Sequence, residues 1–435
     1  MRWTRIARLA AVALIAATPC APPANAVAPP PIDHTRLPAP TPAAPAHRTV
    51  QREVCTVGSL GPGGAPTQLD GLDLAAAWAL TRGAGQRVAV IDTGVTAHRR
   101  LPGLIGGGDY VSAGDGTRDC DGHGTVVAGI IAAAPDPATD RFSGVAPLAT
   151  VIGIRASSAK FAVRGDGPGI GDVDTLAKAV RTAADLGASV INISAVACRP
   201  ASSGLDDRAL GAALAYAVEV KNSVVVAAAG NTDEGCGAGG PMIVTPAWYD
   251  DYVLTVGSVD ARGTASAFTL PGPWVDVAAP GEAVLSLSTV GDAMADTADG
   301  SALRGTSFAA PVVSGLAALI RSRFPQWTPR QVMDRIKDTA HHPPGGRDDV
   351  VGAGVVDPLA ALTFEVAASG EQPRPAAPVP RPAPDSEAAA EPAPAGLHTA
   401  IFGTAVLLAL LLAAVTSRAV TGRKPRRDPT TLDPD

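Results

Sequence analysis

Short apolar runs alternate with longer stretches of small and polar residues through the middle of the chain. Runs rich in β-branched residues predict buried strands over residues 88–91, 151–154, 190–193, 224–228 and 253–256. Longer stretches predict helices over residues 74–80, 124–134, 173–186, 206–220, 308–323 and 329–338. Apolar strands that alternate with helices indicate a parallel sheet covered on both sides. We therefore expect a three-layer α/β fold with a mostly parallel central sheet and a ligand site beyond the carboxyl ends of its strands.

Residues 1–26 have the pattern of a secretory signal peptide. Arg2, Arg5 and Arg8 precede an apolar run over 9–17, and Ala24 and Ala26 form an A-x-A cleavage site. A buried helix is the alternative, but the basic start and the cleavage site favour export. We expect the mature chain to begin near residue 27.

A second apolar stretch covers residues 397–417. About 20 apolar residues in a helix match the thickness of a bilayer core. The tail over 418–435 carries Arg418, Arg423, Lys424, Arg426 and Arg427, which predicts that it is cytoplasmic. Both ends indicate one topology, a cell-membrane protein with a single C-terminal span and an extracytoplasmic domain.

Two proline-rich segments flank the predicted globular domain, which covers residues 67–366. Residues 27–66 are rich in proline and alanine and predict an extended N-terminal arm. Residues 367–396 contain closely spaced prolines and predict a stiff linker to the membrane. The 435 residues are enough for one large domain with these extensions.

Charge and cysteine content narrow the function classes. The net charge of -6 and the absence of a dense basic block in the domain argue against nucleic-acid binding. Of five cysteines, Cys20 lies in the signal region, and the residues before it match a lipid-attachment site poorly. The even number that remains predicts two disulfides outside the cytoplasm, with three pairings open.

The first candidate site residue is Asp92, which follows the strand over 88–91 and precedes Thr93 and Gly94. An aspartate at this point also fits a turn cap. The same Asp-Thr-Gly sequence marks aspartic proteases, which need two such carboxylates sharing a proton. The chain has no second copy, which argues against that class.

Two further motifs follow in the order His, then Ser. His123 lies between Gly122 and Gly124 at the start of a predicted helix, so neighbouring side chains leave the imidazole uncrowded. Ser307 lies where a loop becomes an apolar helix, whose N-terminus favours negative charge. Pro311 is compatible with that helix in its first turn. Taken singly, a structural or exposed histidine and an N-capping serine are the better explanations of these residues.

Together these motifs resemble those of the subtilisin-like serine proteases, the subtilase family, which share the order Asp, His, Ser. Residues 227–231, which end in Asn231, also resemble a family motif, and the resemblance spans about residues 66–364. It implies that Ser307 is the nucleophile, His123 the base and Asp92 the residue that orients the base. It further implies that Asn231 donates to the oxyanion, that the substrate is a polypeptide, and that no metal or cofactor is required.

The resemblance also places the substrate, which would bind as an added strand along Ser194, Ala195 and Val196, near Gly230. Many subtilases have glycine where Val196 stands, so we expect a narrow cleavage preference.

The predicted sheet favours one set of disulfides. Cys198 follows the strand over 190–193 and Cys236 follows the strand over 224–228, so adjacent parallel strands would place both at one edge. This favours Cys198–Cys236 and leaves Cys55–Cys120, which would tie the arm to the loop beside His123.

The acidic loop with Asp115, Asp119 and Asp121 is a candidate for a structural calcium ion, because Ca²⁺ binds several carboxylate oxygens. A solvated loop is the alternative, and the spacing matches no known calcium loop. The Asn192-Ile193-Ser194 sequon lies inside a predicted strand, so we interpret it as structural.

The whole layout resembles the mycosins, the membrane-anchored subtilases of actinobacterial type VII secretion. The matching features are the signal peptide, the arm with one cysteine, the cysteine beside His123, the proline-rich linker and the terminal helix. This resemblance implies an arm that is retained, processing of secretion substrates, and a type VII secretion membrane complex as partner. The alternative is a scaffold of that complex with weak or dispensable proteolysis.

Overall fold

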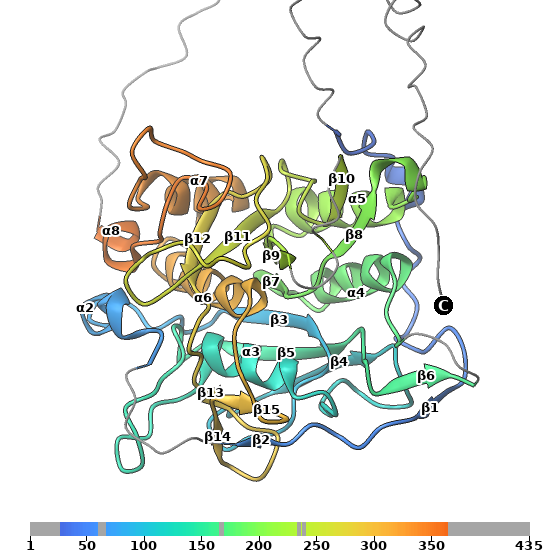
Figure 1. Cartoon of the computed structure of the whole chain (residues 1–435), viewed down its shortest axis with the longest axis horizontal. Coiled ribbons are helices and arrows are strands. Elements are labelled where there is room, and N and C mark those ends of the chain that lie inside the picture. The colour runs from blue at the N-terminus through green and yellow to red at the C-terminus, as the bar shows by residue number, and fades with distance from the viewer. Residues whose placement is uncertain (1–26, 60–66, 165–168, 233–235, 237–240, 364–435) are drawn as a thin grey trace, which may run out of the picture. The chain divides into compact units, whose positions relative to one another are not determined.

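The computed structural model describes residues 27–59, 67–164, 169–232, 236 and 241–363 (Figure 1). The predicted signal peptide, the predicted linker, the predicted membrane span and the basic tail lie outside these residues. Among the described residues, no helix is both long and apolar enough to cross a membrane.

A seven-stranded parallel sheet forms the centre of the domain. Its strand order is β12-β11-β9-β7-β3-β5-β4. In chain order, the strands are β3 (Arg87–Asp92), β4 (Ile105–Asp109), β5 (Thr150–Arg155), β7 (Val190–Ile193), β9 (Val224–Ala228), β11 (Leu254–Val259) and β12 (Val277–Pro280). The parallel sheet that the sequence predicts is confirmed.

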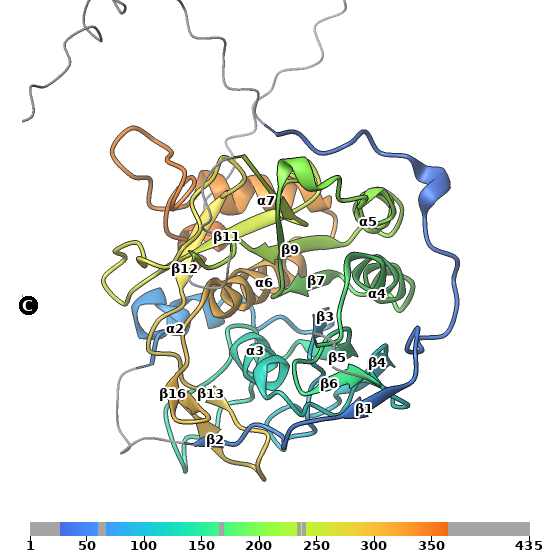
Figure 2. The same cartoon turned by 45° about the vertical axis from the view of Figure 1, so that its right-hand side comes forward.

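Alternate residues of each strand pack into different cores, because successive strand side chains point to opposite faces. In β3, Val88 and Val90 face one core, while Ala89 and Ile91 face the other. Helices α3 (His123–Ala132) and α6 (Thr306–Arg323) cover the first face. Helices α4 (Val173–Asp185) and α5 (Arg208–Ala215) cover the second (Figure 2).

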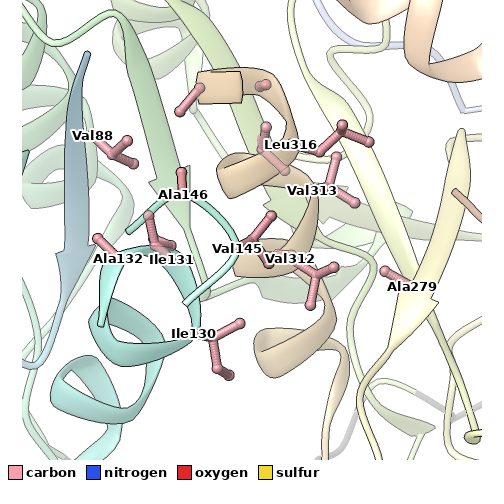
Figure 3. Close-up of a cluster of buried hydrophobic side chains, with 14 of the residues drawn as sticks. Val88, Ile130, Ile131, Ala132, Val145, Ala146, Ala279, Val312, Val313 and Leu316 are labelled. Atoms are coloured by element: carbon pink, nitrogen blue, oxygen red, sulfur yellow. The ribbon is translucent and has the colours of Figure 1, made fainter. Parts of the chain in front are cut away.

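Helices α3 and α6 pack closely against each other on the same face of the sheet. Figure 3 shows Ile130 and Ile131 of α3 beside Val145 and Val312, the latter from α6. All four side chains are fully buried, and Gly315 of α6 leaves room for Val145. This packing fixes the relative position of the two helix N-termini, where the candidate site residues His123 and Ser307 lie.

The remaining elements are short. The helices are α2 (Leu74–Trp78), α7 (Pro329–Asp338), α8 (Pro358–Thr363), the 3-10 turns η1 (His34–Arg36), η2 (Asp70–Leu72) and η3 (Ala201–Ser203), and the π-helical turn η4 (Tyr216–Val220). The small sheets pair β1 (Thr49–Gln51) with β6 (Phe161–Val163), β8 (Ala197–Pro200) with β10 (Met242–Thr245), β13 (Ser286–Leu287) with β14 (Met294–Ala295), and β15 (Thr297–Ala298) with both β16 (Ser301–Ala302) and β2 (Gly58–Ser59).

Two sequence predictions need correction. The helix expected over 206–220 begins at Arg208, because Asp207 stays outside it and its buried carboxylate accepts from Thr245, Trp248 and Tyr249. Pro311 lies in the second turn of α6, not the first. Its missing N–H has a consequence for the site, described below.

The N-terminal arm lies along the outside of the domain, past α5 and α4 to β1 (Figure 2). Ile32 and Leu37 pack against the core on that side, and Arg36 pairs with Asp206 at 3.2 Å. Farther on, β1 pairs antiparallel with β6. The arm is therefore extended, as predicted, but it also adds two short strands to the domain.

Candidate active site

The candidate site lies where β3, β7 and β9 end and where α3 and α6 begin. Asp92 is the last residue of β3, and Ser194 follows β7 directly. His123 opens α3, and Ser307 is the second residue of α6. Parallel strands present their carboxyl ends at one edge, so residues far apart in the chain meet there.

A hydrogen bond joins the buried Asp92 carboxylate to the partly exposed His123 imidazole. His123 Nδ1 lies 2.8 Å from Asp92 Oδ1 and 3.0 Å from Oδ2. The backbone N–H of Thr93 also donates to Oδ1, at 2.7 Å. Gly124 allows this approach, because a Cβ there would lie 2.1 Å from the Gly94 carbonyl oxygen. A carboxylate can only accept here, so the imidazole carries its proton on Nδ1.

The other ring nitrogen of His123 faces Ser307. The distance from Nε2 to Ser307 Oγ is 2.9 Å, and Nε2 accepts the hydroxyl proton in this tautomer. Phe308 contacts the imidazole with its ring centre 4.9 Å away. The His123 side chain is 30% exposed and that of Asp92 only 3%, so the site opens on the serine side. We call Asp92, His123 and Ser307 the Asp–His–Ser cluster.

Asn231 is oriented by the start of α6. Its side-chain oxygen accepts from the N–H and the hydroxyl of Thr306, both at 3.0 Å, so the amide nitrogen is directed away from Thr306. A Cβ on Gly305 would lie 3.0 Å from Ser307 Oγ and 3.4 Å from Asn231 Nδ2. The hydroxyl and the amide therefore face the same small space, which a side chain at 305 would fill.

Ser194 connects the end of β7 to the nucleophile's helix. Pro311 has no N–H to donate to the carbonyl of Ser307 four residues earlier. The Ser194 hydroxyl donates to that carbonyl instead, at 2.7 Å, and itself accepts from Asn192. Ser314 donates to the other side of the Asn192 amide at 2.8 Å. Asn192 is fully buried, which fits the structural interpretation of the sequon.

Comparison with known proteins assigns the family. The profile of the subtilase family matches residues 83–354, more than half of the chain. Mycosin-4 of Mycobacterium tuberculosis is 59% identical over 415 residues, which cover 90% of this chain and 91% of that protein. The chain belongs to the subtilase family, and within it to the mycosins. It is a serine protease of the subtilisin type.

Solved structures agree with this assignment. The MycP3 protease from the type VII (ESX-3) secretion system matches this subtilase with a TM-score of 0.72 and 45% identity, over 78% of this chain and 100% of that chain. A chain of an intact ESX-5 inner membrane complex matches with a TM-score of 0.73 and 40% identity, over 91% of this chain and 100% of that chain.

Asp119 is a site residue of this subtilase whose role the sequence did not show. Its carboxylate is fully buried and accepts from the hydroxyls of Thr93 and Thr125 at 2.8 and 2.7 Å. It also accepts from the backbone N–H groups of Asp121, Gly122 and Thr125. Burial raises the pKa of Asp119, while the bonds from Thr125 and Thr93 oppose this. Asp119 therefore joins the segment after Asp92 to the segment around His123.

The three carboxylates of the acidic loop have separate partners. Asp115 accepts from Thr117, and Asp121 accepts from the Ser158 hydroxyl at 2.6 Å. In the described part of the chain, no three acidic, histidine or cysteine side chains are arranged to hold a metal ion. The structural calcium ion and the expectation of an enzyme without a cofactor therefore both stay predictions.

The structure contains both expected disulfides, Cys55–Cys120 and Cys198–Cys236. The first joins the arm to the loop before His123, where Thr56 N–H also donates to the Cys120 carbonyl at 2.8 Å. Cys198 itself lies in the short strand β8. The second disulfide thus links the β8–β10 pair to the segment after β9.

Residues 194–196, the edge segment, separate two different spaces. On the α4 side is a cavity of about 490 Å³, lined among others by Ala195, Val196, Leu176 and Leu205. On the other side, Val196 Cγ2 and Leu270 Cδ2 lie 3.3 and 3.2 Å from the position of a Cβ on Gly230. We call Val196, Gly230 and Leu270 the Val196 wall. Leu270 was not among the residues that the sequence singled out.

Proposed function

We propose that this subtilase cleaves polypeptides with Ser307 as nucleophile, His123 as general base and Asp92 as the residue that orients His123. Ser307 Oγ attacks the substrate carbonyl while its proton passes to His123 Nε2. The Asp92 carboxylate holds the Nδ1–H and stabilises the imidazolium that results. The departing amine takes the proton from Nε2, and water then hydrolyses the acyl-enzyme by the same steps.

The developing oxyanion would lie between Asn231 Nδ2 and the backbone N–H of Ser307. The Ser307 N–H is in the first turn of α6, where the helix supplies no acceptor, and the helix dipole adds positive potential. Asn231 is held by two bonds from Thr306, so it needs no reorganisation to donate. Donors fixed in this way stabilise the transition state more than the substrate.

The substrate would bind as an added strand along the edge segment. Ala195 is exposed and Ser194 is anchored to the Ser307 carbonyl, so the segment is held at a defined distance from the nucleophile. Main-chain pairing of this kind supplies affinity, and side-chain pockets supply selectivity. Together with the bulk of Val196, this supports a narrow cleavage preference.

The continuous chain of contacts from Asp92 through His123 to Ser307 carries this proposal. Its test is hydrolysis of a peptide library by the full-length protein in detergent, compared with Ser307→Ala. We expect hydrolysis by the wild type and none by the variant. Equal hydrolysis by a folded Ser307→Ala protein would refute the role of Ser307.

We also propose that the domain is extracytoplasmic, anchored by the span over 397–417, and part of a type VII secretion membrane complex. One solved relative is a chain of an ESX-5 inner membrane complex, and another belongs to its periplasmic assembly. The predicted signal peptide and basic tail support the same topology. Protease accessibility in spheroplasts tests it, since only the tail should be protected.

A scaffold role within that complex is the second candidate function. The match to the intact ESX-5 complex covers 91% of this chain, which favours assembly as a task beside proteolysis. Secretion in a deletion strain complemented with Ser307→Ala separates the two. Restored secretion with unprocessed product would support a scaffold, whereas no restoration would show that secretion depends on proteolysis.

A further inference from the structure

The Val196 wall closes one side of the proposed substrate path. Gly230 directly precedes Asn231, and its α-carbon faces the side chains of Val196 and Leu270. A single carbon placed on Gly230 would already lie 3.3 Å from Val196 Cγ2 and 3.2 Å from Leu270 Cδ2. Ordinary carbon contacts are 3.5–4.0 Å, so a carbon attached to Gly230 would displace these two side chains by a few tenths of an ångström, and the space beside Gly230 is narrow.

This space would lie beside the substrate residue whose carbonyl carbon Ser307 attacks. The reacting carbon must lie within reach of Ser307 Oγ and Asn231 Nδ2, which face the same point at Gly305. The α-carbon of that substrate residue is one bond, about 1.5 Å, from the reacting carbon. In a substrate strand paired with the edge segment, the side chain of that residue would emerge between the edge segment and the Gly230–Asn231 backbone, against the Val196 wall.

The wall is supported from behind, so its side chains have little room to retreat. Leu270 is 7% exposed and packs with Val244 and Ala247, which are fully buried, and with Cys236. Val196 packs against the same cluster. The Cys198–Cys236 disulfide crosses this cluster, and β10 pairs with β8 beside it. Close packing of this kind resists the insertion of added volume.

The opposite side of the edge segment is open. The cavity of about 490 Å³ on the α4 side has the size of a binding site for a large side chain. Because side chains alternate along a strand, residues farther from the scissile bond can use that cavity while the residue at the bond faces the wall. The two sides of one segment thus impose different size limits.

We propose that this protease cleaves after a small residue, namely glycine, alanine or serine, and that Val196 and Leu270 set this limit. The inference rests on the proposed function, because it assumes acylation of Ser307. It names the substrate class of the same site: extended polypeptides with a small residue on the acyl side of the cleaved bond.

The test uses the full-length protein in detergent and a peptide library in which every residue type occurs at every position. Cleavage products identified by mass spectrometry give the preference at the acyl-side residue. Matched peptides with alanine, leucine or phenylalanine there give relative kcat/KM. We expect alanine to exceed phenylalanine by on the order of 10²-fold, the range that pocket size alone supplies.

Val196→Gly is the variant that opens the wall. We expect its kcat/KM for the phenylalanine peptide to rise about tenfold or more, while the alanine peptide changes far less. Val290→Gly, the same change at an exposed valine in a distant turn, should leave the ranking unaltered. Val196→Ala, a smaller change, serves if the glycine variant does not fold. The order of kcat/KM among the matched peptides in the wild type tests the size limit even if neither variant folds.

A fluorophosphonate probe separates failure of the inference from failure of the proposed function. No labelling of folded wild type would remove the proposed function itself. Labelling at Ser307 with equal cleavage after phenylalanine and alanine would overturn only the size limit. Labelling without cleavage of any library member would also overturn it, since the library contains every small residue in every context.

Discussion

Asp92 is the last residue of β3 and Val196 lies three residues after β7, yet different contacts surround these two side chains. Asp92 accepts a hydrogen bond from the backbone N–H of Thr93 and another from the imidazole of His123. Val196 acts through the bulk of its side chain against Gly230. We therefore expect catalysis to depend on hydrogen-bond geometry, and selectivity to depend on the volume of a few loop side chains.

We expect the largest effect from a substitution that disrupts the Asp–His–Ser cluster and leaves the Val196 wall unchanged. Asp92→Asn preserves shape but places an N–H₂ or a neutral oxygen against His123 Nδ1, which favours the wrong tautomer. We expect kcat to fall by about 10⁴-fold with little change in KM or in the ranking of substrates. Burst and steady-state kinetics measure this. A shift in the ranking would show that the two regions are not separable.

Asn231 lies between the two regions, because it follows Gly230 and faces Ser307. Asn231→Ala should lower kcat by about 10²–10³-fold, the usual cost of losing one oxyanion donor. Asn231→Asp is the matched control, since it keeps the acceptor for Thr306 and loses the donor. We expect Asn231→Asp to lose at least as much activity as Asn231→Ala. Full activity in the aspartate variant would rule out donation by the Asn231 amide.

One disulfide lies beside the Asp–His–Ser cluster and the other beside the Val196 wall, so removing each one tests whether the two regions act separately. Replacing Cys198 and Cys236 together should lower the free energy of unfolding by about 2–4 kcal/mol and also weaken discrimination against phenylalanine. Replacing Cys55 and Cys120 should lower stability by a similar amount and leave discrimination intact. Denaturant titration and kcat/KM ratios measure both effects. Equal loss of discrimination in both variants would contradict the local role of the wall.

Asp276 provides a control far from both regions, at the amino end of β12. Burial and the charge of Asp250 raise the pKa of Asp276 to about 7. Its folded-state pKa exceeds the unfolded value near 3.8, so stability is greatest below that value and is lost as pH rises toward 7. Asp276→Asn should remove this dependence and be more stable by about 1–3 kcal/mol above pH 7, with unchanged kcat/KM.

Chemical denaturation from pH 4 to 8 tests this prediction. Parallel curves for the wild type and Asp276→Asn would show that Asp276 does not titrate in this range, whereas altered activity would connect it to the site.

Much of the fold could be predicted because the central strands are β-branched and apolar. The runs in β3, β5, β7 and β9 stand out, and the chain order of Asp92, His123 and Ser307 was visible in their motifs. In contrast, β4 contains three successive glycines and β12 two alanines, which are typical of turns and helices. Their place in the sheet comes from tertiary pairing with β5 and β11.

Two features of the site could not be read from the sequence. Asp119 occurs in a polar loop, so its burial and its five donors appear only once β3 and α3 meet. Leu270 lies in a loop remote in sequence from Gly230, with no periodic pattern to place it there. Val196 could be flagged because it replaces a common glycine, but the atom it contacts depends on how three loops pack.

The most direct test of the central claim is the rate of fluorophosphonate labelling of the folded, disulfide-bonded protein. Comparison of the wild type with His123→Ala and Ser307→Ala isolates activation of the serine. The account predicts stoichiometric labelling at Ser307 in the wild type, labelling slowed by at least about 10³-fold in His123→Ala, and none in Ser307→Ala. A folded wild type that is not labelled, or that is labelled equally without His123, would contradict it.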